Sequence, residues 1–599
     1  MEQYHIPGGA IVIVQGNKIL FEKGYGYSNL EEKVAFDVEK TSFSIASITK
    51  TFTAIGMMKL VEEGKIDLDK DILTYIPTLK MDNPYKEKVT VRQLLTHTSG
   101  IDSSYTEDLS YEVIDNNEPH HLLDLLNKRG IKVVSRPGEF VEYSSYGTVV
   151  LGAIVEEVGG ISCISYIEQN ILKPLNMQQT KLLSPDYSRT KGYIYNGKCI
   201  TEAELKGYFK MYPEGGLVST IEDMAHYIQM LVGEGNYEGN TILDEMLLKQ
   251  MFMTQASFDE VLPGMGYGFA ECMNQGVRAI GHAGYSIDGT LSEVVIYPQY
   301  NIGTFIVVNQ GSNNNIQEEF RKAFISRYLK NEDLIDKKFT SEKENEEHIV
   351  KAHKNVAGIY RFSDYSKSNI HKGNTFGMGE IRVEQIDNTT ILISGKDDFT
   401  FEPYKKEAVY IGDLTYRVKD QEEVIVFKED RQGKIAHMAS STSSNHGIYE
   451  KLKWYEEARW QVPFFGIALG IYMIQLVVSV SMYIRRKIKK KKRNSKGYTR
   501  KLINSIAFLN ITFFIYSMCF WGERLRYFVP MDIYINLMMP NISVILTFIL
   551  GGTLIKNLYK RQEGNQKPIY RRLYEMGMLL LSILFALFLN YWNFIGFRL

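Results

Sequence analysis

Apolar residues follow three different patterns along the chain, and these patterns divide it into three parts. Within residues 1–330, apolar and polar residues alternate as in strands near both ends, and apolar residues recur at helical spacing between these ends. The opening run "GGAIVIVQGNKILFEKGYGYSN" predicts two strands joined by a tight turn near Gly16 and Asn17. Further strands are predicted by "RAIGHAG", "TLSEVVIYP" and "IGTFIVVNQG". We expect one domain at 1–330, with an antiparallel sheet assembled from both ends of the segment and a helical insertion between them.

The pattern changes to short strands and polar turns at residues 350–455. The runs are "AGIYRF", "EIRVEQI", "TTILISG", "AVYIGDLTYRV" and "EEVIVFKED". They predict a small all-β barrel or sandwich, in which we identify no chemistry of its own. The preceding stretch at 331–349 is charged enough to be a linker.

The C-terminal part, 460–599, contains runs that are long and apolar enough to span a bilayer. The predicted transmembrane helices are 464–484, 502–521, 533–555 and 576–597. We see no central charged residue in them, and expect them to act as an anchor or assembly module.

Two basic loops between these spans predict the orientation. The loop at 485–501 has eleven basic residues and no acid, and that at 556–572 has six basic residues and one acid. By the positive-inside rule both loops face the cytoplasm. The protein would then be a multi-pass protein of the cell membrane, with the residues before 464 on the extracellular side. The alternative, nucleic-acid binding by the first basic run, has less support because the run lies between two spans.

Composition narrows the class of protein further. The chain has 599 residues, 44% of them hydrophobic, and is therefore not disordered. Its net charge is −1, and the two loops together carry +16, so the remainder carries −17 and offers no footprint for nucleic acid. The cysteines lie far apart and form no CxxC pair, so neither a disulfide framework nor a zinc site is expected. Motifs of zinc peptidases, P-loops and nucleophile elbows do not occur.

An exported domain requires a signal, and the first residues show no basic and apolar leader. We expect that a leader precedes the residues shown, although the first span could also direct export.

Ser47 and Lys50 stand at the head of an apolar helix in "SFSIASITKTFTAIGMMKLVEEG". Three residues apart, they lie one turn apart on one face, so that the ammonium can lie beside the hydroxyl. The helix dipole would also favour negative charge near the serine oxygen. The alternative is an N-capping serine with a solvated lysine. The same spacing occurs at Ser188 and Lys191 without an apolar helix behind it, so the spacing alone does not define a site.

Two further segments supply context for Ser47. Tyr143 and Ser145 lie in a turn before the apolar helix in "PGEFVEYSSYGTVVLGAIVEEVGG", and His282 lies near a strand end in "AIGHAG". With these the sequence resembles the serine β-lactamase-like family, nearest to the class C β-lactamases and the related DD-carboxypeptidases and esterases. The shared elements, all within 1–330 and in the family's order, are "SITK", "LLTHTSG", "PGEFVEYSS", "EGGLVSTIEDM" and "HAG".

The resemblance implies both the fold and the roles of the site residues. The fold would be α+β, with an antiparallel sheet, flanking helices and an all-helical subdomain. Ser47 would attack a carbonyl and form an acyl-enzyme, and Lys50 and Tyr143 would share the proton transfers. Either of the two could be the base, because each needs its pKa shifted toward neutrality. The substrate and oxyanion site would comprise Ser145, His282, Gly284 and Tyr285, with backbone N–H groups of Ser47 and Tyr285 on the oxyanion.

Two positions depart from the family's common pattern. Ser145 stands where many relatives have asparagine, and His282 where many have lysine, so an amide and a permanent charge are replaced by a hydroxyl and a possible donor. Both departures weaken the case for efficient β-lactam hydrolysis. The histidine could also be purely structural, as could Tyr143 as a buried aromatic residue. We expect His97 to be a scaffold residue.

The prediction is therefore a membrane-anchored serine hydrolase that acts on acyl or peptide bonds of the cell envelope, like a DD-carboxypeptidase or esterase. D-alanyl peptides are the leading substrate class. The alternative is a membrane-bound penicillin-binding sensor or a β-lactamase that is acylated at the same serine. The expected partners are a peptide or ester substrate and the lipid bilayer, with no cofactor, no metal and no nucleic acid.

Overall fold

The computed structural model describes most of the chain, in two compact units. The described residues are 1–102, 111–112, 121–128, 130–183, 189–203, 208–286, 288–311, 315–329, 356–377, 379–396, 403–443, 445–489, 498–524, 531–559 and 568–598. The first unit holds the N-terminal domain and the β domain, and the second holds 365–377 and 453–598. The predicted linker at 331–349 lies outside the described residues, as do 490–497 and 560–567 of the basic loops.

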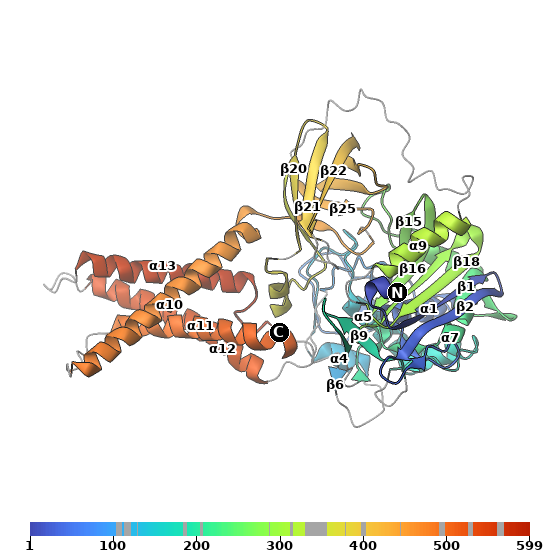
Figure 1. The fold of residues 1–599 in the computed structure, drawn as a ribbon, viewed down its shortest axis with the longest axis horizontal. Helices are drawn as coiled ribbons and strands as arrows, with labels where there is room; N and C mark the ends of the chain where they lie inside the picture. The colour runs from blue at the N-terminus through green and yellow to red at the C-terminus, as the bar shows by residue number, and fades with distance from the viewer. Residues whose placement is uncertain are drawn as a thin grey trace. The chain divides into compact units, whose positions relative to one another are not determined.

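A seven-stranded antiparallel sheet forms the centre of the N-terminal domain (Figure 1). Gln15 pairs with Lys18 across the predicted turn, and Gly9 pairs with Val308, which joins the two ends of the domain. Both predictions, the hairpin and the sheet assembled from both ends, are confirmed. In sheet order the strands are β15 (Ala270–Asn274), β16 (Val277–Tyr285), β17 (Leu291–Tyr297), β18 (Ile302–Val308), β1 (Gly8–Gln15), β2 (Lys18–Asn29) and β3 (Val34–Ala35).

Helices cover both faces of this sheet. Helix α7 (Ile221–Val232) packs on β1 and β18, and α9 (Ile316–Phe324) packs on the opposite face. Successive residues of β17 consequently enter different cores: Val294 joins the large cluster and Val295 the cluster beneath α9. The remaining helices of this domain are α1 (Thr49–Glu62), α2 (Val91–Leu95), α4 (Leu122–Asn127), α5 (Ser145–Gly159), α6 (Cys163–Ile167) and α8 (Glu245–Phe252).

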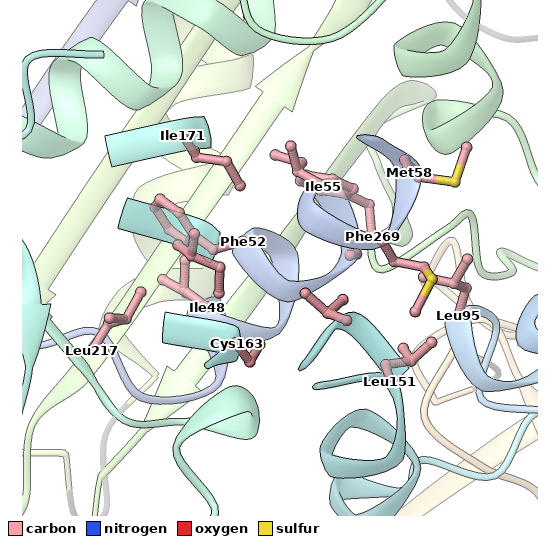
Figure 2. Close-up of a cluster of buried hydrophobic side chains, with 14 of the residues drawn as sticks. Ile48, Phe52, Ile55, Met58, Leu95, Leu151, Cys163, Ile171, Leu217 and Phe269 are labelled. Carbon is pink, nitrogen blue, oxygen red and sulfur yellow. The ribbon is translucent and has the colours of Figure 1, made fainter. Parts of the chain in front are cut away.

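Helix α1 runs through the middle of the large core. Eleven of its 14 residues are buried, so it is enclosed on all sides rather than on one face. Figure 2 shows Phe52 and Ile55 of this helix among side chains from other segments, including Leu151 of α5 and Phe269. Burial of this extent holds the start of α1 in place, and Ser47 lies just before that start.

The β domain is a closed barrel of eight antiparallel strands, which confirms the barrel alternative over the sandwich. The first and last strands pair at Tyr360 and Lys451, which closes the barrel. Tyr360 and Phe427 lie in the barrel core. The strands are β19 (Gly358–Phe362), β20 (Glu380–Gln385), β21 (Thr390–Lys396), β22 (Pro403–Gly412), β23 (Thr415–Val418), β24 (Val424–Glu429), β25 (Ile435–Ser440) and β26 (Tyr449–Lys451).

The second unit contains four helices that are long and apolar enough to cross a membrane. Consecutive helices pack against each other. Two of them contain an internal proline, Pro463 and Pro540. The helices are α10 (Ala458–Ile488), α11 (Tyr498–Arg524), α12 (Met531–Tyr559) and α13 (Ile569–Tyr591).

The fourth predicted span, 576–597, is displaced from the helix in the structure. Helix α13 begins at Ile569 and ends at Tyr591. Asn593 has a φ of 61° and donates through Nδ2 to the carbonyls of Lys367 and Asn369, at 3.0 and 2.9 Å. These bonds hold the chain in a turn, which ends the helix. The apolar residues of the segment do not indicate such bonds. The helix instead starts earlier and includes Glu575, which forms an ion pair with Arg571 at 3.4 Å.

Candidate active site

Ser47 lies on a strained turn between a strand and a buried helix. Strand β4 (Phe43–Ser44) leads into the 3-10 turn η2 (Ala46–Ile48), and α1 follows. Ala46 has a φ of 44°, a left-handed conformation that is costly for a residue with a Cβ. Ala46 and Ile48 are buried, whereas Ser47 remains partly accessible. The turn therefore presents this hydroxyl on the surface of an otherwise buried segment.

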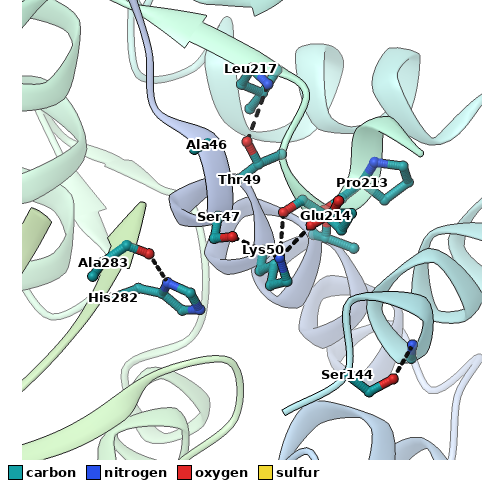
Figure 3. Close-up of polar contacts among 12 residues, drawn as sticks. Ala46, Ser47, Thr49, Lys50, Ser144, Pro213, Glu214, Leu217, His282 and Ala283 are labelled. Atoms are coloured by element: carbon teal, nitrogen blue, oxygen red, sulfur yellow. Dashed lines mark hydrogen bonds and ion pairs between the residues drawn. The ribbon is translucent and has the colours of Figure 1, made fainter. Parts of the chain in front are cut away.

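Lys50 lies beside Ser47, as the helical spacing predicted. Its Nζ is 3.0 Å from Ser47 Oγ, 2.6 Å from Glu214 Oε2 and 2.6 Å from the Glu214 carbonyl (Figure 3). An ammonium has three N–H donors, and these three oxygens accept all of them. The side chains of Lys50 and Glu214 are only 2% and 7% exposed, so each charge is compensated by the other rather than by water.

Glu214 is a candidate residue that the sequence interpretation missed. It ends η5 (Tyr212–Glu214), directly before the two glycines of the "EGGLVSTIEDM" segment. Thr53 Oγ1 of α1 donates to the Pro213 carbonyl at 2.7 Å, and Thr49 Oγ1 accepts from the Leu217 N–H at 3.2 Å. These bonds fasten the loop along α1 and bring the carboxylate to Lys50. In the sequence, the position of this acidic residue directly before two glycines was the feature that could have indicated Glu214 as a site residue.

Tyr143 completes the group around Ser47. It precedes α5, whose N-cap Ser144 accepts from the Gly147 N–H at 3.1 Å. Burial raises the pKa of Tyr143 well above 10, although its hydrogen bond with Ser47 acts in the opposite direction. Lys50 Nζ is 5.1 Å from the centre of its ring. At neutral pH Tyr143 is therefore a phenol that can donate a proton, rather than a phenolate.

The ring of His97 packs against the ring of Tyr143. The ring centroids of His97 and Tyr143 are 4.5 Å apart, and His97 Nδ1 accepts from the Ser144 N–H at 3.2 Å. Burial and the charge of Lys50 hold the pKa of His97 well below its ordinary value, so the ring is neutral. Its contacts are those of a scaffold residue that holds the turn before α5.

His282 carries its proton on the nitrogen that faces its own backbone. Nδ1 lies 2.7 Å from the Ala283 carbonyl, which can only accept, so Nδ1 is the protonated nitrogen (Figure 3). Burial, and then the charge of Lys50, lower the pKa of His282 to about 3. In the neutral ring Nε2 is thus an acceptor. The donor that the sequence suggested for this position is used within the strand.

The other predicted substrate residues lie on the same two elements. Gly284 allows β16 to approach η2, because a Cβ at this position would lie 2.3 Å from the Ile45 carbonyl oxygen. Tyr285 ends β16 with its side chain 56% exposed, and Ser145 is the first residue of α5 and is 2% exposed. The close approach at Gly284 brings the end of β16 beside the turn that carries Ser47.

The β domain, in which the sequence indicated no chemistry of its own, also reaches this site. His446 of the barrel stacks on Tyr143, with ring centroids 4.9 Å apart and an angle of 12° between the planes. The Tyr143 N–H donates to the His446 carbonyl at 2.8 Å. No periodic pattern in the sequence predicts that His446 contacts Tyr143.

Metal chemistry has no visible donor set in the described part of the chain, where no group of three or more His, Cys, Asp and Glu side chains could hold an ion. The described cysteines, Cys163, Cys199 and Cys272, are free thiols, and burial raises the pKa of Cys272 to about 11.

Comparison with known proteins identifies the family of the N-terminal domain. The family model described as Beta-lactamase matches residues 1–323, more than half of the 599 residues. The chain belongs to the β-lactamase family, whose α+β domain is followed here by a barrel and four long apolar helices.

Individual relatives match the N-terminal domain. Protein flp of Staphylococcus aureus (strain NCTC 8325 / PS 47) is 29% identical over 320 residues, which are 52% of this chain and 61% of that protein. The chain thus spans about three fifths of the length of this relative. The N-acetylmuramyl-L-alanine amidase of Bacillus subtilis (strain 168) is 27% identical, over 51% of this chain and 77% of that protein.

Two solved structures are similar to this chain. The octameric penicillin-binding protein homologue from Pyrococcus abyssi is 23% identical, with a TM-score of 0.47, and covers 75% of this chain and 97% of its own. The crystal structure of SurE is 17% identical, with a TM-score of 0.51, over 75% of this chain and 96% of its own.

Proposed function

We propose that the protein is a membrane-anchored serine hydrolase that cleaves acyl or peptide bonds of the cell envelope through an acyl-enzyme on Ser47. The observation that carries the proposal is the 3.0 Å contact between Lys50 Nζ and the oxygen of a partly exposed serine. Tyr143 supplies a second proton-transfer group at the same oxygen. A nucleophile, an acceptor for its proton and a donor for the leaving group are the components that acyl transfer requires.

In the acylation step, Ser47 Oγ bonds to the substrate's carbonyl carbon. Its proton passes to Lys50 as Lys50 passes one of its own to the Glu214 carboxylate. The backbone N–H groups of Ser47 and Tyr285 would stabilise the oxyanion. The bond to the leaving group then breaks, and the leaving oxygen or nitrogen takes the proton of Tyr143. The proton held on Glu214 returns through Lys50 to Tyr143, which restores the starting charges.

Deacylation would use the same groups in reverse. A water molecule gives one proton to Lys50 as Lys50 passes one of its own to the Glu214 carboxylate, and the water oxygen bonds to the acyl carbon. Ser47 leaves as the alcohol after it takes a proton from Lys50, the Glu214 proton returns to Lys50, and the acid product departs. The number of protons on the protein is unchanged after one turnover.

The chemistry of His282 favours a particular kind of substrate. An acceptor at Nε2 suits an amide N–H or an amino group, whereas a free carboxylate requires a donor. Ser145 adds a short hydroxyl on α5 where a longer amide would reach further. Amide bonds of envelope peptides are therefore the proposed substrates. A D-alanyl peptide among them would have to place its terminal carboxylate away from Nε2. The relative named as an amidase supports amide cleavage.

The orientation in the membrane is part of the proposal. Four candidate spans support a multi-pass membrane protein, and the basic loops at 485–501 and 556–572 support a cytoplasmic position for both loops. Protease added to intact cells should then remove the residues before 464 and leave the loop at 485–501 uncut. Protection of the N-terminal domain would contradict the envelope substrate.

Intact-mass analysis of the full-length protein in detergent tests the function directly. A fluorophosphonate, a penicillin and a D-Ala-D-Ala peptide are offered in parallel to the wild type and to Ser47→Ala. We expect a covalent adduct in the wild type alone, and repeated release of product from the peptide or from a simple ester. An adduct of one equivalent without release would favour the sensor. Equal labelling of both proteins would exclude Ser47 as the nucleophile.

A further inference from the structure

The barrel contacts the catalytic domain at the tyrosine of the site. His446 lies in the segment between β25 and β26, which includes residues 441–443 and 445–448 of the described chain. Its carbonyl accepts the Tyr143 N–H at 2.8 Å, and its ring stacks on the Tyr143 ring with centroids 4.9 Å apart. Both the backbone and the side chain of Tyr143 are therefore held by one residue of another domain.

This segment is fastened on both sides of His446. Asn445 Nδ2 donates to the carbonyl of Glu271 in the catalytic domain at 2.7 Å. The Ile448 N–H donates to Ser363 Oγ in the barrel at 3.1 Å. Because the segment has bonds to both domains, the position of His446 is determined by how the barrel docks.

The docking surface beneath the segment is apolar and extends to a polar edge. Phe258 and Leu262 of the catalytic domain share one buried cluster with residues of the barrel. Lys428 of the barrel donates to the Phe258 carbonyl and lies 3.9 Å from Asp259. The barrel residues of the cluster are Val424, Val426, Ala439 and Ile448.

The backbone of Tyr143 is not held by a helix or a strand, so contacts from other segments have to fix its position. Residues 141–144 belong to no strand or helix. The ring contacts of Tyr143 come from His97 at 4.5 Å, His446 at 4.9 Å and His282 at 6.0 Å. His97 and His282 belong to the catalytic domain, so His446 is the contribution of the barrel. His446 is exposed as a residue, whereas burial of its imidazole lowers the pKa of the ring to about 4, so the ring that packs on Tyr143 is neutral.

We propose that His446 is a positioning residue: through it, the docked barrel holds Tyr143 at Ser47 in the orientation needed to protonate the leaving group. The inference rests on the proposed function. It assigns to the barrel a part in the reaction. A displacement of about 1 Å in such a group can lower the rate by about a hundredfold.

The test uses two substrates with the same acyl group, a p-nitrophenyl ester and a p-nitroanilide. The phenolate leaves without a proton, whereas the anilide nitrogen must be protonated, so only the anilide depends on a correctly placed Tyr143. In the full-length protein, His446→Ala should lower kcat for the anilide by about ten- to a hundredfold and change KM by less than about twofold. For the ester, kcat should stay within about threefold of the wild type.

Two further variants separate positioning from general damage. His446→Phe retains a planar ring and the backbone carbonyl, and should restore most of the anilide activity. His437→Ala removes another barrel histidine, whose ring lies 4.5 Å from Phe140 in the same interface, and should leave both substrates near wild-type rates.

The failures of the two proposals are distinguishable. If the wild type turns over neither substrate and a fluorophosphonate does not label it, the proposed function is wrong. If the wild type is active and His446→Ala matches it on the anilide, the inference about the barrel is wrong. An equal loss on both substrates, or the same loss in His437→Ala, would likewise contradict positioning.

Discussion

Each of the two compact units buries a cluster of polar side chains, and the clusters differ in charge and in access. In the first unit, Lys50 and Glu214 form a buried ion pair beside a serine that remains partly exposed. In the second, Gln475 donates to Asn504 Oδ1 at 2.6 Å and accepts from the Tyr574 hydroxyl at 2.6 Å. The cluster beside the accessible serine is thus charged, whereas these helices are joined by neutral groups.

The difference follows from what each environment allows. A buried charge is tolerated only when a partner and further hydrogen bonds compensate for its lost hydration, as the two Glu214 oxygens do for Lys50. Neutral amides and hydroxyls between apolar helices satisfy one another at much lower cost, and link α10, α11 and α13. The first arrangement suits proton transfer, and the second suits assembly.

The largest effect is expected from Ser47→Ala, which should abolish covalent labelling and turnover. The matched control is Ser188→Ala, which has the same spacing to a lysine and lies outside the described residues. Labelling is measured by intact mass with a fluorophosphonate, and the control should be labelled like the wild type. Loss of labelling in the Ser188 variant alone would reverse the assignment.

Glu214→Gln tests whether the ion pair takes part in proton transfer. The amide keeps the size of the side chain but cannot hold the proton of Ser47, so we expect kcat to fall about a hundredfold. Glu156→Gln is a control at another buried glutamate, which accepts from the Leu122 N–H at 3.1 Å, and should leave kcat unchanged. An unchanged or higher kcat for Glu214→Gln would show that Lys50 acts as a neutral base without the carboxylate.

His282→Lys should reverse the selectivity of the site, because it replaces an acceptor with a permanent cation. The acylation rate with a fluorescent penicillin should rise about ten- to a hundredfold, if the contact to its carboxylate is realised in the transition state. Turnover of an amide substrate should fall. Ser145→Asn adds only a neutral hydrogen bond and should contribute less. No gain with penicillin in a protein that still hydrolyses a simple ester would mean that shape excludes β-lactams.

The buried imidazole of His282 should also make stability depend on pH. The pKa of His282 is lowered to about 3, so below about pH 6.5 the unfolded chain binds a proton that the folded chain does not. Stability is retained above that pH and is lost as the pH falls toward 3, with a loss of about 2 kcal/mol between pH 7 and pH 5. His282→Gln should lose about 2 kcal/mol less over this range in denaturant titrations. Equal losses in both proteins would contradict a buried neutral ring.

The smallest effect is expected in the helical unit. Gln475→Leu combined with Asn504→Leu removes the neutral network, and should reduce the stability of the detergent-solubilised helices by about 1–2 kcal/mol. Hydrolysis of a simple ester should not change, because these residues belong to the other unit. A loss of activity without unfolding would indicate coupling between the two clusters, as a sensor requires.

The sequence by itself determined the features that depend on near neighbours in the chain. The contact between Ser47 and Lys50 follows from helical spacing, and the pairing of Gln15 with Lys18 follows from a two-residue turn. The helices of the second unit follow from the length of their apolar runs. In each case the residues that matter are a few positions apart, so the geometry of one element places them.

Only the tertiary structure decided which distant residues meet at that contact. Glu214 and His446 reach Lys50 and Tyr143 through a loop bonded along α1 and through the docking of a separate barrel. The end of α13 likewise depends on the bonds that Asn593 makes to residues far from it in the chain. Such contacts bring together segments more than a hundred positions apart. Their free energy comes from packing and buried hydrogen bonds that leave no periodic pattern in the sequence.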